Sequence, residues 1–150
     1  MLSGRLIHLI ESHWDEITAR ALRQIHGDSR LAHIGRLPEL ELREWGQETL
    51  ENLGHWLSGA NEEDLGQKYE ELGRLRFDES VPLHEAVYAI AILKEKIIDF
   101  MKEQAPTKTS LQLYAEEELE HRLSRFFDVL IVHLVKGYES AWRRAAHAIA

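Results

Sequence analysis

The stretch Leu72–Glu85, LGRLRFDESVPLHE, joins two segments that both have helical periodicity. It places Arg74 and Arg76 before a short acidic link that contains Pro82, and a strongly apolar run, AVYAIAIL, follows at once. Proline is tolerated in a link or in the first turn of a helix but not in a helix interior, so one helix ends here and another begins. The sequence therefore predicts two consecutive helices with an arginine pair at the mouth of a buried helix.

Outward from this stretch, the chain divides into five periodic segments, and its three prolines all fall between them. The prolines are Pro38, Pro82 and Pro106. Apolar residues recur at three- and four-residue spacing within each segment, and no segment alternates with a period of two. This pattern predicts helices over about 2–26, 39–57, 61–77, 82–102 and 110–147.

The last of these helices would be close to forty residues long, with Gly137 as a candidate break. A helix that outruns its domain is typical of pairing with a partner or of transmission to a downstream element. The expected fold is therefore all-α: one domain over residues 1–150, a five- to six-helix bundle with a long C-terminal helix.

Composition argues against several classes of function. The 150 residues include 18 basic and 26 acidic side chains, a formal net charge of −8, and the basic residues are scattered. A nucleic-acid-binding surface needs a clustered positive patch. The absence of cysteine removes disulfides and thiolate chemistry. No apolar run approaches membrane-spanning length and the N-terminus lacks the features of a signal peptide, so the expected location is the cytoplasm.

Candidate catalytic and metal-binding patterns are weak throughout the sequence. Glu118 and His121 form one ExxH motif, and Glu51 with His55 forms one ExxxH motif. A helical di-iron site needs two ExxH helices and two further carboxylates. No GxSxG motif or phosphate-binding loop occurs. We therefore predict that the protein is not an enzyme and has no metal site.

Two longer patterns carry a resemblance to a known family. They are YEELGRLRFDESVPLHEAVYAIAILKEKI at 69–97 and RFFDVLIVHLVKGYESA at 125–141. Together they resemble the RsbRD-type N-terminal domain of bacterial stressosome co-antagonist proteins, which also stands at the front of some sensor histidine kinases. The resemblance implies a globin-like, dimeric signal-input domain that acts on a signalling protein or on a fused effector domain. No STAS domain or kinase core fits in the remaining residues, so the chain is either an excised input domain or a stand-alone relative.

The first pattern also resembles the frame of globin-coupled sensors, in which the haem-ligating histidine follows a glycine by three residues and precedes a proline by six. Here Gly73 stands three residues before Arg76, and Pro82 stands six after it. Arginine stays protonated and offers iron no lone pair, so the resemblance implies a domain without haem. The alternatives are a haem-binding gas sensor that uses His84 or His133, and a structural interaction module without any small ligand.

The residues expected to bind a ligand or signal lie in this frame or among apolar neighbours. They are Trp14, Arg76, His84, Tyr88, Phe127 and His133. Each has an ordinary alternative. Arg76 can pair with Asp78 or Glu79 at a helix end, His84 can lie at the surface or cap a helix, and the aromatic residues and His133 can belong to the core.

A homodimer surface is predicted on the long C-terminal helix. It would consist of Phe126, Leu130, Leu134 and Tyr138, with packing inside the domain as the alternative. Signalling would then be a shift of this helix between two packings, biased by a ligand or a partner.

Overall fold

The computed structural model describes residues 2–59, 62–104 and 107–149, and every regular element in these ranges is helical. The elements are α1 (Leu2–Ser12), α2 (Trp14–His26), the 3-10 helix η1 (Ser29–Leu31), α3 (Ala32–Gly35), α4 (Glu39–Leu50), α5 (Leu53–Leu57), α6 (Glu62–Asp78), α7 (Leu83–Lys102) and α8 (Ser110–Ile149). The prediction of an all-α fold with a long C-terminal helix is confirmed. Pro106, predicted to separate two helices, lies outside the described residues.

Two predicted helices are each divided in two. The segment 2–26 is interrupted at His13, and the segment 39–57 is interrupted by a turn at 51–52. Helical periodicity continues across such short interruptions, so the spacing of apolar residues does not reveal them. The segment 27–38, expected to be a loop, contains η1 and α3.

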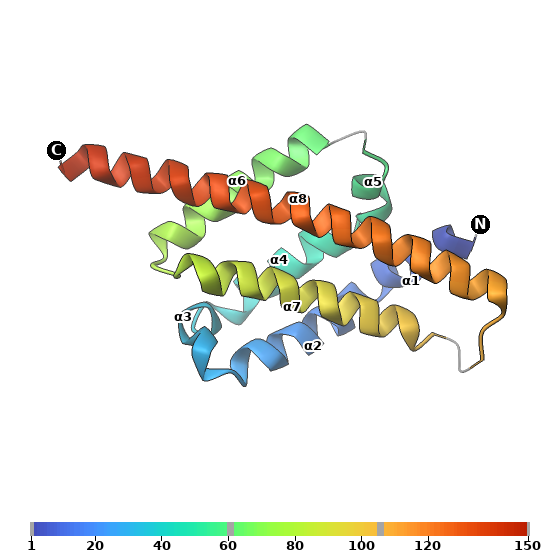
Figure 1. The fold of residues 1–150 in the computed structure, drawn as a ribbon. Coiled ribbons are helices and arrows are strands. Elements are labelled where there is room, and N and C mark those ends of the chain that lie inside the picture. Colours follow the sequence, from blue (N-terminus) through green and yellow to red (C-terminus); the bar gives the residue numbers. More distant parts are fainter. Residues whose placement is uncertain (1, 60–61, 105–106, 150) are drawn as a thin grey trace.

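The helices are arranged around α8, which runs along the whole molecule in Figure 1. The closest partner of α8 is α6, and α7 packs beside it. On the other side of α7 lies α2, which in turn contacts α4. These helices enclose one apolar core, whose fully buried side chains include Ile17, Leu42, Leu93, Leu123 and Phe127.

The contact between α6 and α8 depends on two glycines that face each other. A Cβ atom added at Gly137 would lie 2.1 Å from the carbonyl oxygen of Glu70, and one added at Gly73 would lie 2.3 Å from the carbonyl oxygen of Leu134. Interiors are close-packed and backbone atoms cannot yield, so both positions require glycine at this separation. The predicted break at Gly137 is therefore wrong. The helix continues through this residue, and the glycine allows the two backbones to approach.

The turn between α6 and α7 is attached to α8 as well. Ser80 has a positive φ of 63°, and the N–H of Val81 donates a 3.0 Å hydrogen bond to the carbonyl oxygen of Arg76. The N–H of Ser80 bonds the carbonyl oxygen of Phe77 at 2.9 Å, which completes a Schellman motif with serine where glycine is usual. The Tyr138 hydroxyl on α8 donates to the carbonyl oxygen of Val81 at 2.9 Å. The end of α6 is thus fixed both by its own backbone and by α8.

We predict that Gly137→Ala lowers the free energy of unfolding by about 1–3 kcal/mol, because the added methyl group forces α6 and α8 apart. Urea unfolding followed by circular dichroism measures this difference. Gly4→Ala is the matched control, since a Cβ atom at Gly4 meets no atom within 4 Å. Equal stability of Gly137→Ala and wild type would contradict the close approach.

Candidate functional site

Arg76 is a buried arginine near the end of α6, with 3% of its surface exposed. Its Nη1 donates hydrogen bonds to Glu41 Oε2 at 2.5 Å and to Glu79 Oε1 at 2.9 Å. Glu41 belongs to the first turn of α4, and Glu79 directly follows α6. A buried charge must be paired, and here two carboxylates share one guanidinium. We call these three residues the Arg76 cluster.

The Arg76 cluster carries one more negative than positive charge when both carboxylates are ionised. The pKa of Glu79 is raised, first because burial disfavours the charged form and then because its carboxyl is hydrogen-bonded to Glu41. Arg76 opposes this change but does not overcome it. Two carboxylates so close together favour holding a proton between them.

A second hydrogen-bonded group adjoins the Arg76 cluster between α4 and α6. The Thr49 hydroxyl donates to the carbonyl oxygen of Trp45 at 2.8 Å, so the Tyr69 hydroxyl, 2.6 Å away, donates to Thr49. The indole N–H of Trp45 donates to the Tyr69 oxygen at 3.2 Å. Burial raises the pKa of Tyr69 to about 12, so its hydroxyl stays protonated. These bonds hold α4 against α6 where Glu41 reaches Arg76.

The space beside Arg76 is nearly filled by protein. An internal void of about 10 Å³ adjoins it, lined by Trp45, Ile90 and Leu134 among others. This is room for about one water molecule. A groove of about 150 Å³ opens between α4 and α6 over Glu48 and Tyr69. Cofactor-sized ligands occupy cavities of several hundred Å³, so this arrangement does not fit a haem group next to Arg76.

The structure does not bring the six predicted ligand-binding residues together. Phe127 is fully buried in the core, and Trp14 is half-buried on α2. His84 is exposed, and Tyr88 is 42% exposed with the Arg30 guanidinium 5.8 Å from its ring centroid. Of these six residues, only Arg76 lies at a charged site within the core.

His133 packs between α8 and α6 and does not face a cavity of ligand size. Its Nδ1 lies 2.8 Å from Glu70 Oε2, and its ring fills the space over Gly66, where a Cβ atom would be 2.6 Å from the ring. Neither His133 nor His84 lines the void beside Arg76 or the groove between α4 and α6. The geometry therefore gives haem binding through either histidine no support.

The four residues predicted to form a dimer surface lie inside the domain instead. Phe126, Leu130, Leu134 and Tyr138 are at most 8% exposed and belong to the core cluster. They share the inner face of α8 with Gly137, so they pack within the chain and are covered in this conformation. Their burial favours packing inside the domain, which is the alternative to the predicted dimer surface. An apolar stripe at helical spacing has the same sequence pattern whether it faces a core or a partner.

The outer face of α8 carries an apolar stripe that sequence reasoning missed. We define the outer stripe as Val132, Val135, Trp142 and Ile149. Val132 is 52% exposed, Trp142 64% and Ile149 88%. With Glu139 and Ala146 between them, these positions recur at alternating intervals of three and four residues, which is the spacing of a coiled-coil seam. Leu123, Phe127, Leu130 and Leu134 on the core face recur at the same intervals, so the spacing alone does not separate the two faces of the helix.

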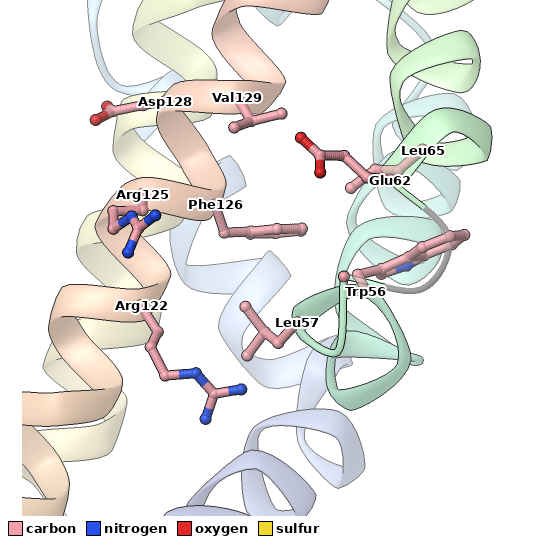
Figure 2. Close-up of a pocket in the computed structure, with 10 residues that line it drawn as sticks. Trp56, Leu57, Glu62, Leu65, Arg122, Arg125, Phe126, Asp128 and Val129 are labelled. Carbon is pink, nitrogen blue, oxygen red and sulfur yellow. The ribbon is translucent and has the colours of Figure 1, made fainter.

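A larger cavity also lay beyond sequence reasoning. It is an open groove of about 510 Å³ between the α5–α6 region and α8 (Figure 2). Its walls come from Trp56, Leu57 and Leu65 on one side and from Arg122, Phe126 and Val129 on the other. These two groups are more than fifty residues apart, and no local motif marks either of them.

Residues 2–59, 62–104 and 107–149 offer neither a metal-binding cluster nor a membrane-spanning helix. No three or more histidine, aspartate and glutamate side chains are grouped there in a way that could hold a metal ion. No helix in these ranges is both long and apolar enough to cross a membrane.

Comparison with protein families shows the family to which the chain belongs. The family described as the RsbT co-antagonist protein rsbRD N-terminal domain matches residues 15–149, from α2 to the end of α8. The chain belongs to this family, which confirms the resemblance drawn from the sequence and implies an input role in stress signalling. Neither the curated proteins nor the solved structures include a match to the chain.

The Arg76 cluster predicts a distinct pH dependence of stability. The pKa of Glu79 is higher in the folded protein than its ordinary value of 4.5, so the folded state binds this proton more tightly. The resulting stabilisation is fully present below the unfolded pKa and is lost as pH rises through the folded pKa. Glu79→Gln mimics the protonated carboxyl, so we predict that its stability relative to wild type increases as pH rises from 4 to 8.

Urea unfolding at a series of pH values measures this difference. Glu117→Gln, which changes an exposed carboxyl on α8, is the control. Its free energy of unfolding plotted against pH should run parallel to that of wild type. A Glu79→Gln curve that also stays parallel to wild type would contradict the proton-sharing arrangement.

Proposed function

We propose that this domain is a signal-input module that works without haem and passes its signal to a downstream stress-response or kinase effector. The observation that carries this proposal is the Arg76 cluster. A guanidinium paired with Glu41 and Glu79 stands where the resemblance to sensor globins puts the iron ligand, and the void of about 10 Å³ and the groove of about 150 Å³ beside it are too small for haem. The site therefore stabilises the fold and leaves sensing to another part of the domain.

Transmission through α8 is supported by the way this helix is packed. It contacts α6 and α7 along the core, and its last turns extend past both helices in Figure 1. From Trp142 onward its residues are exposed or half-buried. A rigid helix anchored in the core at one end and free at the other converts a shift in core packing into a displacement of its end.

A homodimer joined through the outer stripe is the second part of the proposal. Apolar residues at heptad spacing on an exposed helix are stabilised by a second helix with the same pattern. Two copies of α8 would bury Trp142 and Ile149 against each other and would couple the two input domains. This places the interface on the face of α8 opposite to the one predicted from the sequence.

We predict that Trp142→Glu converts a dimer to a monomer without unfolding the domain, because it removes the largest apolar side chain of the outer stripe and adds a second carboxylate next to Glu139 in the seam. Light scattering coupled to size exclusion measures the mass, and circular dichroism checks the fold. Ala148→Glu is the control, since it adds the same charge at an exposed position on another side of the helix. A monomeric wild type, or a dimeric Trp142→Glu, would refute this interface.

The same two variants test the signalling role in cells. Introduced into the full reading frame, Trp142→Glu should abolish the response of a stress-induced reporter, while Ala148→Glu should leave it intact. A reporter that responds normally with a monomeric Trp142→Glu domain would overturn transmission through paired α8 helices.

A further inference from the structure

The groove between the α5–α6 region and α8 has the composition of a ligand-binding site. Its volume of about 510 Å³ lies within the range of small-molecule sites. One wall consists of Arg122, Phe126 and Val129, which follow one another along α8 at intervals of four and three residues. Leu57 faces them from α5, as Figure 2 shows, and Trp56 lines the groove from the same helix. The groove is therefore elongated along α8, with an apolar middle.

Two arginines line this groove, Arg122 and Arg125, and no ion pair between either of them and a carboxylate of the described residues is present. Arg20, Arg30 and Arg76 all form ion pairs with carboxylates. Among the residues that the structure describes, no carboxylate pairs with Arg122, which is half-buried at one end of the groove. Figure 2 shows its guanidinium projecting from α8 on the same side as Phe126 and Leu57.

Carboxylates limit how much negative charge the groove can accept. The Glu62 side chain reaches toward α8 at the opposite end of the groove from Arg122 (Figure 2). Arg125 and Asp128 project from the outer side of α8, away from Leu57, and belong to the rim. The groove thus has one positive end, an apolar middle and one negative end.

We propose that this groove binds an organic monoanion with an elongated apolar body, of the medium-chain fatty acid class. Its carboxylate would form a bidentate pair with the Arg122 guanidinium, and its chain would lie over Leu57, Phe126 and Val129. Arginine matches a carboxylate through two parallel hydrogen bonds. Arg122 is directed into the groove, whereas Arg125 projects from the outer side of α8. One inward cation and the facing Glu62 favour a singly charged headgroup and disfavour a second charge at the far end of the chain.

The site is distinct from the Arg76 cluster and from the outer stripe. Binding would bridge α5 and α8 and so would stabilise their contact in the folded state. Because binding is measured directly, its test requires neither dimerisation nor an effector, and its failure would leave the proposed function standing.

Calorimetric titration of the full chain with decanoate, kept below its micelle concentration, tests the proposal. Wild type should bind one decanoate per chain, and Arg122→Gln should weaken this binding about tenfold or more, because it removes a charge-assisted pair. Arg144→Gln, which alters an exposed arginine away from the groove, is the matched control and should bind as wild type does. Decan-1-ol should bind weakly and equally to wild type and Arg122→Gln.

Two further measurements locate the site. Val129→Trp should abolish decanoate binding by filling the groove, while thermal melting shows that the variant is folded. Decanedioate should bind more weakly than decanoate to wild type, and Glu62→Gln should reduce that difference. The proposal is overturned if wild type does not bind decanoate, if Arg122→Gln binds it equally well, or if a folded Val129→Trp retains the affinity.

Discussion

The close approach of α6 and α8 at Gly73 and Gly137 is the constraint on which the rest of the structure depends. With no side chain between them, the two backbones meet directly, and this sets the position of every residue on the neighbouring turns. Arg76 lies one turn beyond Gly73 and is held in the interior, within reach of Glu41 on α4. Tyr138 follows Gly137 and fixes the turn at Val81. A single backbone contact thus places both the buried charge and the entry to α7.

The Arg76 cluster is a costly arrangement that the surrounding packing enforces. Burial of a guanidinium costs free energy unless its partners are close and well oriented. Removal of one partner of a buried ion pair destabilises the fold by more than the intact pair stabilises it. Here the partners come from α4 and from the residue that follows α6, so the cluster ties α4 to the end of α6.

Much of the helical architecture could be predicted from the sequence, because Pro38 and Pro82 mark true boundaries and apolar periodicity marks the faces. The interruption at His13 could not, since one irregular residue leaves the periodicity intact. Only one of the two partners of Arg76 could be predicted. Glu79 is three residues from Arg76 and therefore within local reach, whereas Glu41 precedes Arg76 by 35 residues and is brought close only by the fold. The inner and outer stripes of α8 could not be assigned to core and surface, because that requires knowing where α6 lies.

An absorption titration with haemin tests most directly the central claim that arginine occupies the ligand position of a domain that works without haem. We predict that purified wild-type protein leaves the spectrum of free haemin unchanged, since Arg76 offers no lone pair and little space adjoins it. A Soret band that sharpens at one haemin per chain, and that disappears in His84→Ala or His133→Ala, would contradict the account and would make the protein a haem-based sensor.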